Sequence, residues 1–515
     1  MRVKEIFDKY NYSEFLKPLP FRKILPCNSN KFAEFLNSAI AEGETIYGDW
    51  DLDCDGICAL KTIQIALDAI GYDKYVIAQP SVKRHVLSEP YARQIASQYK
   101  YILIVDSSSN SPEILDIFEE YNTKVLIIDH HEINSIKVNN YNKSFIINPY
   151  IDKALNNNKL LTNLSAGMLC SLLADWYTKT YYPDKYVNLR NHHFIYGVIS
   201  LYSDSMPVSI YTASLIRNIS TTLDMPPLVK AFQTQYDGFD KNFISWKFAP
   251  IINSLARFDR YDILYQMFFL NAVDESTINY ARNMQKKAIQ VRELLYSSLK
   301  IIICNNMVIG EIDAAKVQYF RSRGINPRNF TGLVAQMLSE NYRLVGVCLI
   351  EVDRMEYEGS VRDTFNRKLL PVFKRFLQAD GHASAFGIAC LSTTLPIMEN
   401  MLDKAIGDIP ILSNKILIDC TNSDVKALDF VSDITQIAKF NEFTGNNLPE
   451  VIIKLTLTPD CNIQVFPNSR IVANVGQFRI IDWNVQAPML HKGATLKLKP
   501  YLRNSNVEFA IVKEK

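Results

Sequence analysis

The chain has 515 residues, of which 48% are hydrophobic and 11% aromatic, so it can bury several cores, and its length indicates roughly three domains. Its formal net charge of +2 excludes a chain-wide basic surface, so any nucleic-acid-binding surface must be local. No apolar stretch reaches the roughly 18 residues of a membrane span, and the first residues carry no signal-peptide core, so we expect a soluble cytoplasmic protein without a membrane partner.

Short apolar runs alternate with longer helical patterns from about residue 40 to 150, which is typical of βαβ units and a mostly parallel sheet. Helical periodicity continues to about residue 270, interrupted by prolines such as Pro207 and Pro250. A polar, charged stretch without Pro or Gly follows, as in a long helix between two lobes. We predict an α/β catalytic domain over 1–275 and a connecting helix over 276–300.

A second α/β unit is indicated next, with strand-like runs at 300–303 and 344–350. After residue 410 the pattern changes to alternating β runs, including 451–455 and 496–499, which predicts a small β-barrel. The predicted boundaries are 301–408 for the second α/β domain and 409–515 for the barrel.

Acidic and histidine side chains stand where three predicted strands end. The apolar runs at 45–48, 101–105 and 125–128 lead into Asp49, Asp51, Asp53 and Asp55, into Asp106, and into Asp129, His130 and His131. Parallel strands of α/β folds carry their sites at the carboxyl ends, and carboxylates packed within a few ångströms repel one another unless a cation compensates them. A divalent metal site is therefore predicted at this sheet edge.

The alternating acids from Asp49 to Asp55 would share one face of an extended segment, and Gly56 then allows the backbone to turn into a helix. A calcium loop or a solvated acidic turn is the alternative. The apolar segments on both sides argue against a free loop. Oxygen ligands with one or two imidazoles suit Mn²⁺ or Mg²⁺ better than zinc.

The sequence closely resembles the DHH phosphoesterase superfamily and, within it, the RecJ-like single-strand exonucleases. Segment 51–56 resembles the first motif of that family, Asp106 the second, 129–131 the third and Asp204 the fourth. Further segments match in order at 249–257, 332–335, 359–362, 380–387 and 441–450. An ordered series of this kind is far more specific than one DHH triplet.

The resemblance implies an α/β fold with a parallel-sheet DHH domain, a DHH-associated domain and a C-terminal OB-like barrel. It also implies an enzyme that degrades single-stranded DNA from 5′ to 3′ by two-metal hydrolysis, in DNA repair, recombination or replication. The expected partners are single-stranded DNA and, among proteins, a single-strand-binding protein or replication proteins.

The resemblance further assigns site residues. Two Mn²⁺ or Mg²⁺ ions would be held by Asp53, Asp55, Asp106, His130 and Asp204, with Asp106 as the bridge. His131 would face the scissile phosphate, Asp51 would be a ligand or an acceptor beside one, and Asp129 would orient His130. Arg257, Arg362 and His382 would line the phosphate path, although Arg257 could instead cap a helix and His382 could pack in a turn.

The chain departs from the family pattern in three places. An alignment through Gly48 and Asp49 would move the ligand set to Asp49, Asp51 and Asp53, whereas the preferred register ends in Asp55 and Gly56 and keeps the glycine turn. The second motif closes with serines, Ser107 to Ser109, whose hydroxyls could still bind a phosphate or a carboxylate. Asp380 stands where a glycine is expected, and its charge could weaken phosphate binding.

Two other functions fit parts of the pattern. A phosphodiesterase for short oligonucleotides or cyclic dinucleotides would share the first two domains but needs no distant barrel. A non-catalytic replication scaffold would be expected to lose ligands that this chain retains. In the barrel, Phe478, Trp483 and the lysines from Lys492 to Lys499 are candidate single-strand contacts. The richness in Asn, Lys, Ile and Tyr favours an AT-rich bacterial or phage source, with action in the bacterial or host cytoplasm.

Overall fold

The protein divides into two compact units, of which the larger comprises Arg22–Met206 and Asn218–Ile411 and the smaller includes Pro207–Arg217 and Leu412–Lys515. The computed structural model describes residue 8 and residues 24–79, 87–133, 143–156, 161–186, 192–218, 225–235, 237–353, 355–365, 367–409, 415–420, 428–441, 450–457, 462–466, 470–475, 478–482, 489–503 and 506–512. None of the helices in these ranges is long and apolar enough to cross a membrane.

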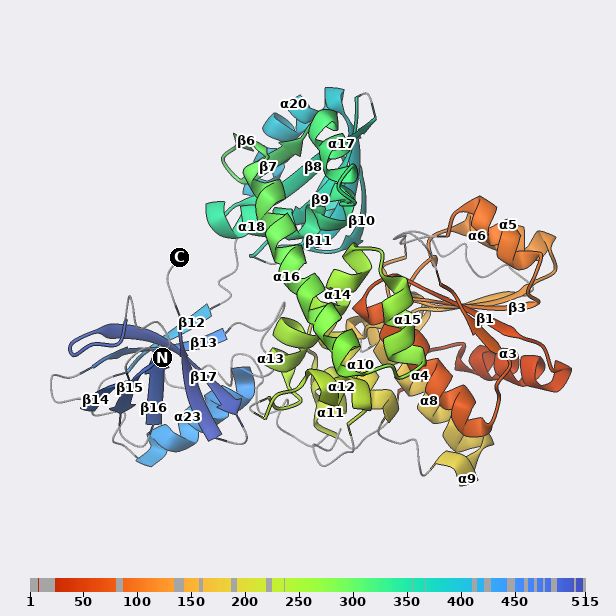
Figure 1. Cartoon of the computed structure of the whole chain (residues 1–515), viewed down its shortest axis with the longest axis horizontal. Helices are drawn as coiled ribbons and strands as arrows, with labels where there is room; N and C mark the ends of the chain where they lie inside the picture. Colours follow the sequence, from red (N-terminus) through yellow and green to blue (C-terminus); the bar gives the residue numbers. More distant parts are fainter. Residues whose placement is uncertain are drawn as a thin grey trace. The chain divides into compact units, whose positions relative to one another are not determined.

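The first sheet of the larger unit is parallel, and its described strands have the order β2-β1-β3-β4-β5. These strands are β1 (Ile46–Trp50), β2 (Tyr75–Ile77), β3 (Tyr101–Val105), β4 (Lys124–Ile128) and β5 (Ser144–Ile147). Helices cover both faces (Figure 1), with α3 (Ser29–Glu42) and α4 (Cys54–Ile70) on one side and α5 (Glu89–Ala96) and α6 (Pro112–Glu120) on the other. All residues of β1 and β3 are buried, as expected for apolar strands covered on both faces. The predicted parallel sheet is confirmed.

A layer of helices continues the larger unit. Two of them, α8 (Ala166–Tyr181) and α10 (His192–Ser203), pack against α4 and against each other. The remaining elements of this layer are α7 (Pro149–Asn156), η2 (Leu161–Asn163), α9 (Pro183–Tyr186), α12 (Pro227–Phe232), α13 (Lys241–Phe243), η3 (Ile244–Phe248), α14 (Ala249–Arg257) and α15 (Tyr261–Phe269). The 23-residue helix α16 (Glu275–Ser297) stands where the connecting helix was predicted.

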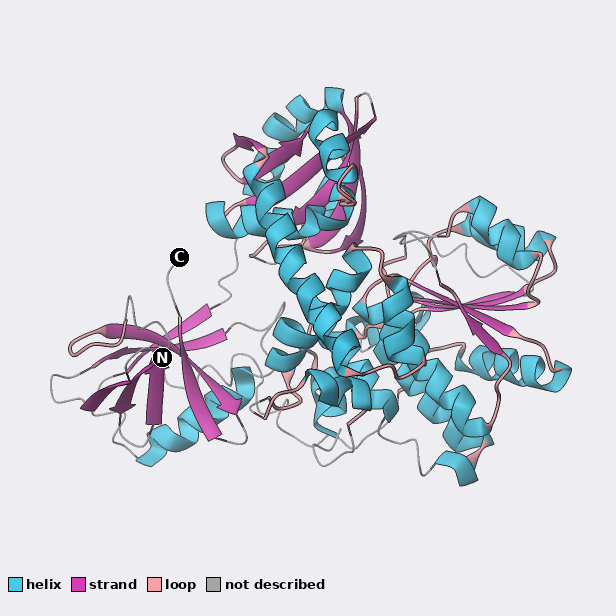
Figure 2. Cartoon of the chain, in the orientation of Figure 1, coloured by secondary structure: helices cyan, strands magenta, loops and turns pink. Residues whose placement is uncertain are grey.

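The second sheet of the larger unit is mixed and has the strand order β10-β11-β9-β8-β7-β6 among the described residues. Helices again lie on both sides of it (Figure 2). Its strands are β6 (Lys300–Ile303), β7 (Met307–Ile312), β8 (Val345–Asp353), β9 (Glu356–Arg362), β10 (Gln378–His382) and β11 (Ala385–Leu391). Its helices are α17 (Ala314–Arg321), η4 (Pro327–Phe330), α18 (Thr331–Tyr342), α19 (Leu370–Phe373), η5 (Ser392–Thr394), α20 (Leu395–Ile397), η6 (Met398–Leu402) and α21 (Asp403–Gly407). One core joins the sheet to α16, α17 and α18, and a second core joins it to α19 and η6.

The smaller unit is built on a seven-stranded sheet within its described part, in the order β12-β13-β17-β18-β16-β15-β14. Its elements are α11 (Ile210–Asn218), β12 (Lys415–Cys420), α23 (Leu428–Asn441), β13 (Glu450–Thr456), β14 (Asn462–Phe466), β15 (Arg470–Val475), β16 (Phe478–Asp482), β17 (Thr495–Arg503) and β18 (Asn506–Ile511). The predicted C-terminal β structure is therefore confirmed, whereas the OB-like barrel and the four domain boundaries stay predictions.

One predicted nucleic-acid contact in this unit is wrong. Phe478 is only 7% exposed and packs edge-on against Phe509, with ring centroids 5.4 Å apart, so it belongs to the core and is not available for base stacking. Trp483 lies outside the described residues. Asn441 opens the last of the predicted motifs and binds the backbone of Val451 and Pro500, while residues 442–449 lie outside the described residues.

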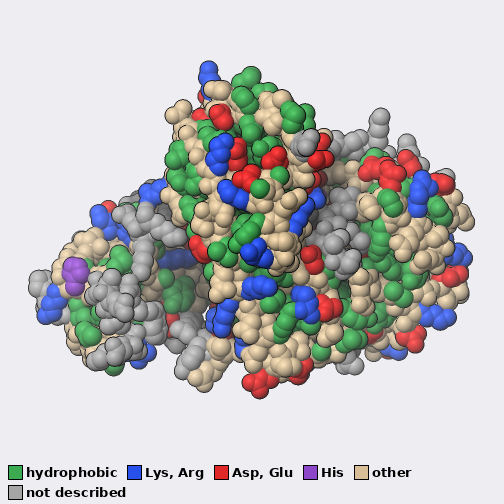
Figure 3. Space-filling model, turned by 45° about the horizontal axis from the view of Figure 1, so that its top comes forward, with side chains coloured by type: hydrophobic (Ala, Val, Ile, Leu, Met, Phe, Trp, Pro, Cys, Tyr) green, Lys and Arg blue, Asp and Glu red, His purple; other side chains and the backbone are tan. Residues whose placement is uncertain are grey.

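The surface carries both signs of charge. On the face shown in Figure 3, basic and acidic side chains are interspersed, which agrees with the net charge of +2. Electrostatic attraction of an anionic substrate therefore has to come from particular side chains and not from the chain as a whole.

We expect Gly346→Ala to lower the free energy of unfolding by about 1–3 kcal/mol, because overpacking of a tight interface has a cost of this order. A Cβ at this position of β8 would lie 2.0 Å from the carbonyl oxygen of Ala335 on α18. Denaturant unfolding measures the change. The matched control is Gly387→Ala on β11, where the nearest atoms are 3.8 Å away; equal effects of the two substitutions would contradict the expectation.

Candidate metal and catalytic site

Three strand ends of the first sheet meet in register. Trp50 of β1 pairs with Val105 of β3, and Val105 pairs with Ile128 of β4. The next residue of each strand is an aspartate, so Asp51, Asp106 and Asp129 emerge side by side at the carboxyl edge. The β1–α4, β3–α6 and β4 loops therefore deliver acids to one place, as the sequence predicted from their positions.

The loop after β1 is closed by a side-chain cap. Asp53 precedes α4 and accepts hydrogen bonds from the backbone N–H groups of Asp55 and Gly56, at 2.9 and 3.2 Å, as an N-cap aspartate does. A Cβ at Gly56 would lie 2.2 Å from the carbonyl oxygen of Asp51. Only glycine allows this close turn, which favours the register ending in Asp55 and Gly56.

Asp55 points away from solvent into the helical layer. It accepts hydrogen bonds from the backbone N–H groups of Ala166 and Gly167, at 3.1 and 2.9 Å, and from the hydroxyl of Ser200. Burial, and then the neighbouring Asp204 and Asp53, raise the pKa of Asp55 well above its usual value. The carboxylate is thus held in place while its ionised form is disfavoured in the absence of a cation.

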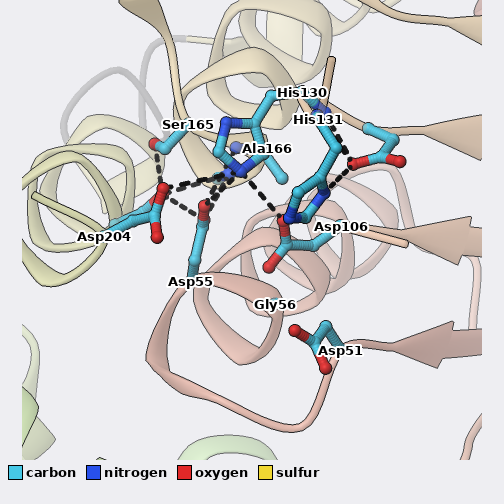
Figure 4. A network of polar contacts seen from close by, with 12 residues as sticks. Asp51, Asp55, Gly56, Asp106, His130, His131, Ser165, Ala166 and Asp204 are labelled. Carbon is cyan, nitrogen blue, oxygen red and sulfur yellow. Dashed lines mark hydrogen bonds and ion pairs between the residues drawn. The ribbon is translucent and has the colours of Figure 1, made fainter. Parts of the chain in front are cut away.

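His130 stands at the centre of three carboxylates (Figure 4). Its Nε2 lies 3.2 Å from Oδ1 of Asp106 and 3.6 Å from both Oδ2 of Asp55 and Oδ2 of Asp204. Burial lowers the pKa of His130 to about 3, so its imidazole is neutral near pH 7, which is the form that binds metals.

Asp106 has an unusual backbone and a strongly perturbed carboxyl group. Its φ of 65° is left-handed, a conformation that costs a non-glycine residue free energy and that clusters at functional sites. Burial, followed by Asp55 and Asp53, raises the pKa of Asp106 well above its usual value. Oδ1 of Asp106 is buried and has no hydrogen-bond partner among the described residues.

Asp129 orients a histidine, but a different one from the one predicted. Its Oδ1 lies 2.7 Å from Nδ1 of His131 and accepts the backbone N–H of His130 at 2.7 Å, while its Oδ2 accepts the hydroxyl of Ser109. The aspartate therefore fixes the ring of His131 and only the backbone of His130. Burial alone would lower the pKa of His131, but Asp129, with Asp204 and Asp51, raises it to about 10, so His131 is a cation near pH 7.

The second sheet adds the side chains of His382 and Arg362 to the site. His382 of β10 lies 3.3 Å from Oδ2 of Asp204 and stacks on His131, with ring centroids 5.2 Å apart. Burial, and then the charge of Arg362 on β9, lower the pKa of Arg257 to about 10, and burial lowers the pKa of Arg362 to about 10 as well, so both guanidiniums remain charged near pH 7. Guanidinium groups are suited to binding a phosphate.

Among the four groups of acidic and histidine side chains that could hold an ion, two combine the carboxylates predicted to bind metal. Ligand atoms of Asp55, His130 and Asp204 lie within 4.8 Å of one another, and so do those of Asp51, Asp53 and Asp106. Asp106 belongs to the second group and also reaches His130 of the first. The orphaned buried oxygen of Asp106 and the repelling carboxylates fit oxygen-preferring divalent cations such as Mn²⁺ or Mg²⁺.

The structure thus places eight of the ten residues predicted for the site within contact of one another. The charge of Asp53 acts on Arg257 and that of Asp204 on Arg362, and the roles of all ten stay predictions. Asp49, which belongs to the alternative register, is part of β1 and of neither acidic group among the described residues. Sequence reasoning missed the residues that support Asp55, namely Ser200 and the helix start at Ala166 and Gly167. The available signal was the Ser165-Ala166-Gly167 sequence, an N-cap serine followed by small residues.

We expect Asp106→Asn to relieve the electrostatic repulsion among the crowded carboxylates and, at the same time, to weaken metal binding. Because the folded pKa of Asp106 is raised, the wild-type carboxyl stabilises the fold only at low pH, and this stability is lost as the pH rises above about 4, the unfolded value. In EDTA at pH 8 the variant should melt at the same or a higher temperature than the wild type, and the difference should shrink toward pH 5. With excess Mn²⁺ the melting temperature should rise substantially only for the wild type. Thermal unfolding in both conditions measures this; an equal gain by the variant would contradict it.

The chain is similar in sequence to known proteins. Residues 45–186 match the DHH family, N-terminal domain. The chain is 21% identical over 487 residues, 85% of its length and 78% of the relative's, to YorK of Bacillus subtilis (strain 168), which is named as a candidate SPbeta-prophage-derived single-strand DNA-specific exonuclease. A protein of Bacillus phage SPbeta with the corresponding name matches to the same extent.

Solved structures match almost the whole chain. RecJ of Thermus thermophilus in complex with Mn²⁺ has a TM-score of 0.72 at 14% identity, covering 99% of this chain and 74% of that one. Its complex with Mg²⁺ has a TM-score of 0.64 at 13% identity, covering 99% and 73%. At this identity the likeness concerns the fold. Residues 45–186 are therefore a domain of the DHH family, and the chain has the fold of RecJ.

Proposed function

We propose that this protein is a metal-dependent phosphodiesterase that degrades single-stranded DNA from its 5′ end. The observation that carries the proposal is the pairing of two acidic ligand groups, which Asp106 links, with the charged side chains of His131, Arg257 and Arg362. Metal ligands beside phosphate-binding groups are what hydrolysis of a phosphodiester requires. The RecJ fold and the name of the YorK relatives support the choice of single-stranded DNA.

Two Mn²⁺ or Mg²⁺ ions would be held by Asp55, His130 and Asp204 on one side and by Asp51 and Asp53 on the other, with Asp106 between them. Bound divalent cations supply Lewis-acid polarisation of the phosphate and lower the pKa of water to near neutrality. Asp51 is thereby proposed as a ligand, which is one of the two roles that the sequence left open.

The protein's own side chains then have separate tasks. His131, kept protonated by Asp129, donates a hydrogen bond to the scissile phosphate and stabilises the charge that develops on it. Arg362 and Arg257 hold the phosphate in place through their guanidinium groups. His382 contacts Asp204 and His131 and so closes the site from the side of the second sheet.

The proposal also covers the cellular compartment and the process in which this activity takes place. The names of the relatives refer to a prophage and a phage, and they support action on DNA in a bacterial cytoplasm, or in a host cytoplasm if the chain is phage-encoded. DNA repair, recombination or replication is the proposed context, with a single-strand-binding protein or replication proteins as partners.

We expect Asp106→Asn to lower the Mn²⁺-dependent release of nucleotides from 5′-labelled single strands by about 100-fold or more, since Asp106 would help to hold the cations, whose polarisation of the phosphate is worth several kcal/mol. EDTA should abolish wild-type release. The matched control, Asp116→Asn on the exposed surface of α6, should act like the wild type.

Parallel digestion of 3′-labelled strands and of dinucleotides separates the alternatives. Cleavage of dinucleotides with intact long strands would favour a short-substrate phosphodiesterase, and cleavage of neither would favour a replication scaffold. Release from the 3′ end would overturn the proposed polarity.

We expect Gly332→Ala to raise the KM for single-stranded DNA by about tenfold, which is the loss of one hydrogen bond to a charged group. A Cβ at Gly332 would lie 2.6 Å from Nη2 of Arg362, so the guanidinium has to move. Steady-state kinetics measure the change, with Gly387→Ala as the control on β11. A KM unchanged from the wild type would contradict a phosphate-binding role of Arg362.

A further inference from the structure

The helix that ends at Arg257 has accessible side chains along one face from residue 248 onward, and at Ser245, Trp246 and Lys247 within its π turn. The elements α13, η3 and α14 follow one another without a break from residue 241 to 257. Residues 4, 7 and 11 positions apart share a helix face, since three turns take about 10.8 residues. Trp246, Pro250, Asn253 and Arg257 have this spacing and form a stripe in which all four are exposed or half-buried, whereas Phe248, Ala249, Ile251, Ile252, Ser254, Leu255 and Ala256 are buried.

The stripe begins at the acidic site. Oδ1 of Asn253 accepts a hydrogen bond of 2.9 Å from the backbone N–H of Cys54, between Asp53 and Asp55. Asn329 donates a hydrogen bond of 3.0 Å to the carbonyl oxygen of Arg257, which ties this end of the helix to the η4 segment before α18. A DNA strand bound at the acidic site therefore contacts the stripe directly.

Trp246 stands at the other end of the stripe. It lies 11 residues from Arg257, or about 16 Å along a helix. At 75% exposure it is the most exposed large hydrophobic side chain among the described residues. It belongs to η3, a π-helical turn, and such turns are frequent at functional sites.

The turn is firmly anchored beneath the indole. Phe248 is buried and its ring packs against those of Phe232, Phe243 and Phe268, at centroid distances of 5.7, 6.1 and 6.5 Å. The backbone that presents Trp246 is therefore well packed, while the indole itself is left on the surface.

Two cationic side chains of α16 lie over aromatic rings near this helix. The guanidinium of Arg282 lies 5.9 Å from the ring of Phe232, which packs on Phe248 beneath the Trp246 turn. The ammonium of Lys287 lies 4.8 Å from the ring of Phe258, next to Arg257. Lys247 is paired with Asp237 within the same segment. The cationic side chains of α16 have the sign of charge that complements a phosphate backbone.

We propose that Trp246 stacks on a base of single-stranded DNA whose backbone follows the stripe from the acidic site past α16. The proposal rests on the proposed function and adds a binding position beyond the reacting phosphate. Stacking on an indole is available to every base, so the contact needs no particular sequence. A duplex hides its base faces, so this contact also favours single strands.

The test measures binding and cleavage separately. In EDTA, Trp246→Ala should bind a fluorescein-labelled oligo-dT about five- to tenfold more weakly than the wild type, at the lower end of what one stacked base contributes. Trp246→Phe, which keeps a ring, should retain most of the affinity. The control is Leu270→Ala, another exposed apolar side chain, at 62%, that lies outside the stripe, and it should bind like the wild type. Binding of a blunt duplex should not respond to the alanine substitution.

Cleavage of long strands with Mn²⁺ supplies the second measurement. Trp246→Ala should raise KM more than it lowers kcat, because the contact lies outside the reacting bond. Unchanged oligo-dT affinity and KM in this variant, with an active wild type, would overturn the proposal. A wild type that neither binds nor cleaves single strands would instead overturn the proposed function itself, and thermal unfolding of the variant separates either result from misfolding.

Discussion

The site depends on one electrostatic constraint, the crowding of carboxylates at the carboxyl edge of a parallel sheet. The pairing of Trp50 with Val105 and of Val105 with Ile128 places Asp51, Asp106 and Asp129 side by side, and α4 adds Asp55 from below. In this buried place the carboxyl groups of Asp55 and Asp106 resist ionisation. A cation is the means by which all of them can be charged at once, so near neutral pH the fold carries an electrostatic cost that a bound metal removes.

The negative edge is balanced by a second lobe. The strands β9 and β10 bring Arg362 and His382 to the acids of the first sheet, and His382 stacks on His131 while it contacts Asp204. This arrangement separates two tasks. The first sheet presents the oxygen ligands together with His131, and the second lobe adds Arg362 and His382, so neither lobe has all the proposed site residues by itself.

Support for the acids comes from small residues and backbone groups. The N–H groups at the start of α8 and the hydroxyl of Ser200 hold Asp55, and a Cβ at Gly167 would lie 2.5 Å from that hydroxyl. Asp129 is held in a comparable way, since its oxygens are hydrogen-bonded to Ser109, to the ring of His131 and to backbone N–H groups. Within the DHH triplet, His130 is thus a proposed metal ligand, His131 is a cation, and Asp129 orients the ring of His131.

The sequence by itself determined the parallel sheet, the strand ends that carry the acids and the family resemblance, because these depend on local periodicity and on residues close together in the chain. It could not assign Asp129 to the ring of His131, since both histidines follow it directly and only the turn after β4 decides which ring folds back. It also misplaced Phe478, whose neighbour Phe509 is distant in sequence. The meeting of Arg362, His382 and Asp204 was decided only by tertiary structure, because contacts between distant segments are set by the packing of whole elements and leave no periodic signal in the chain.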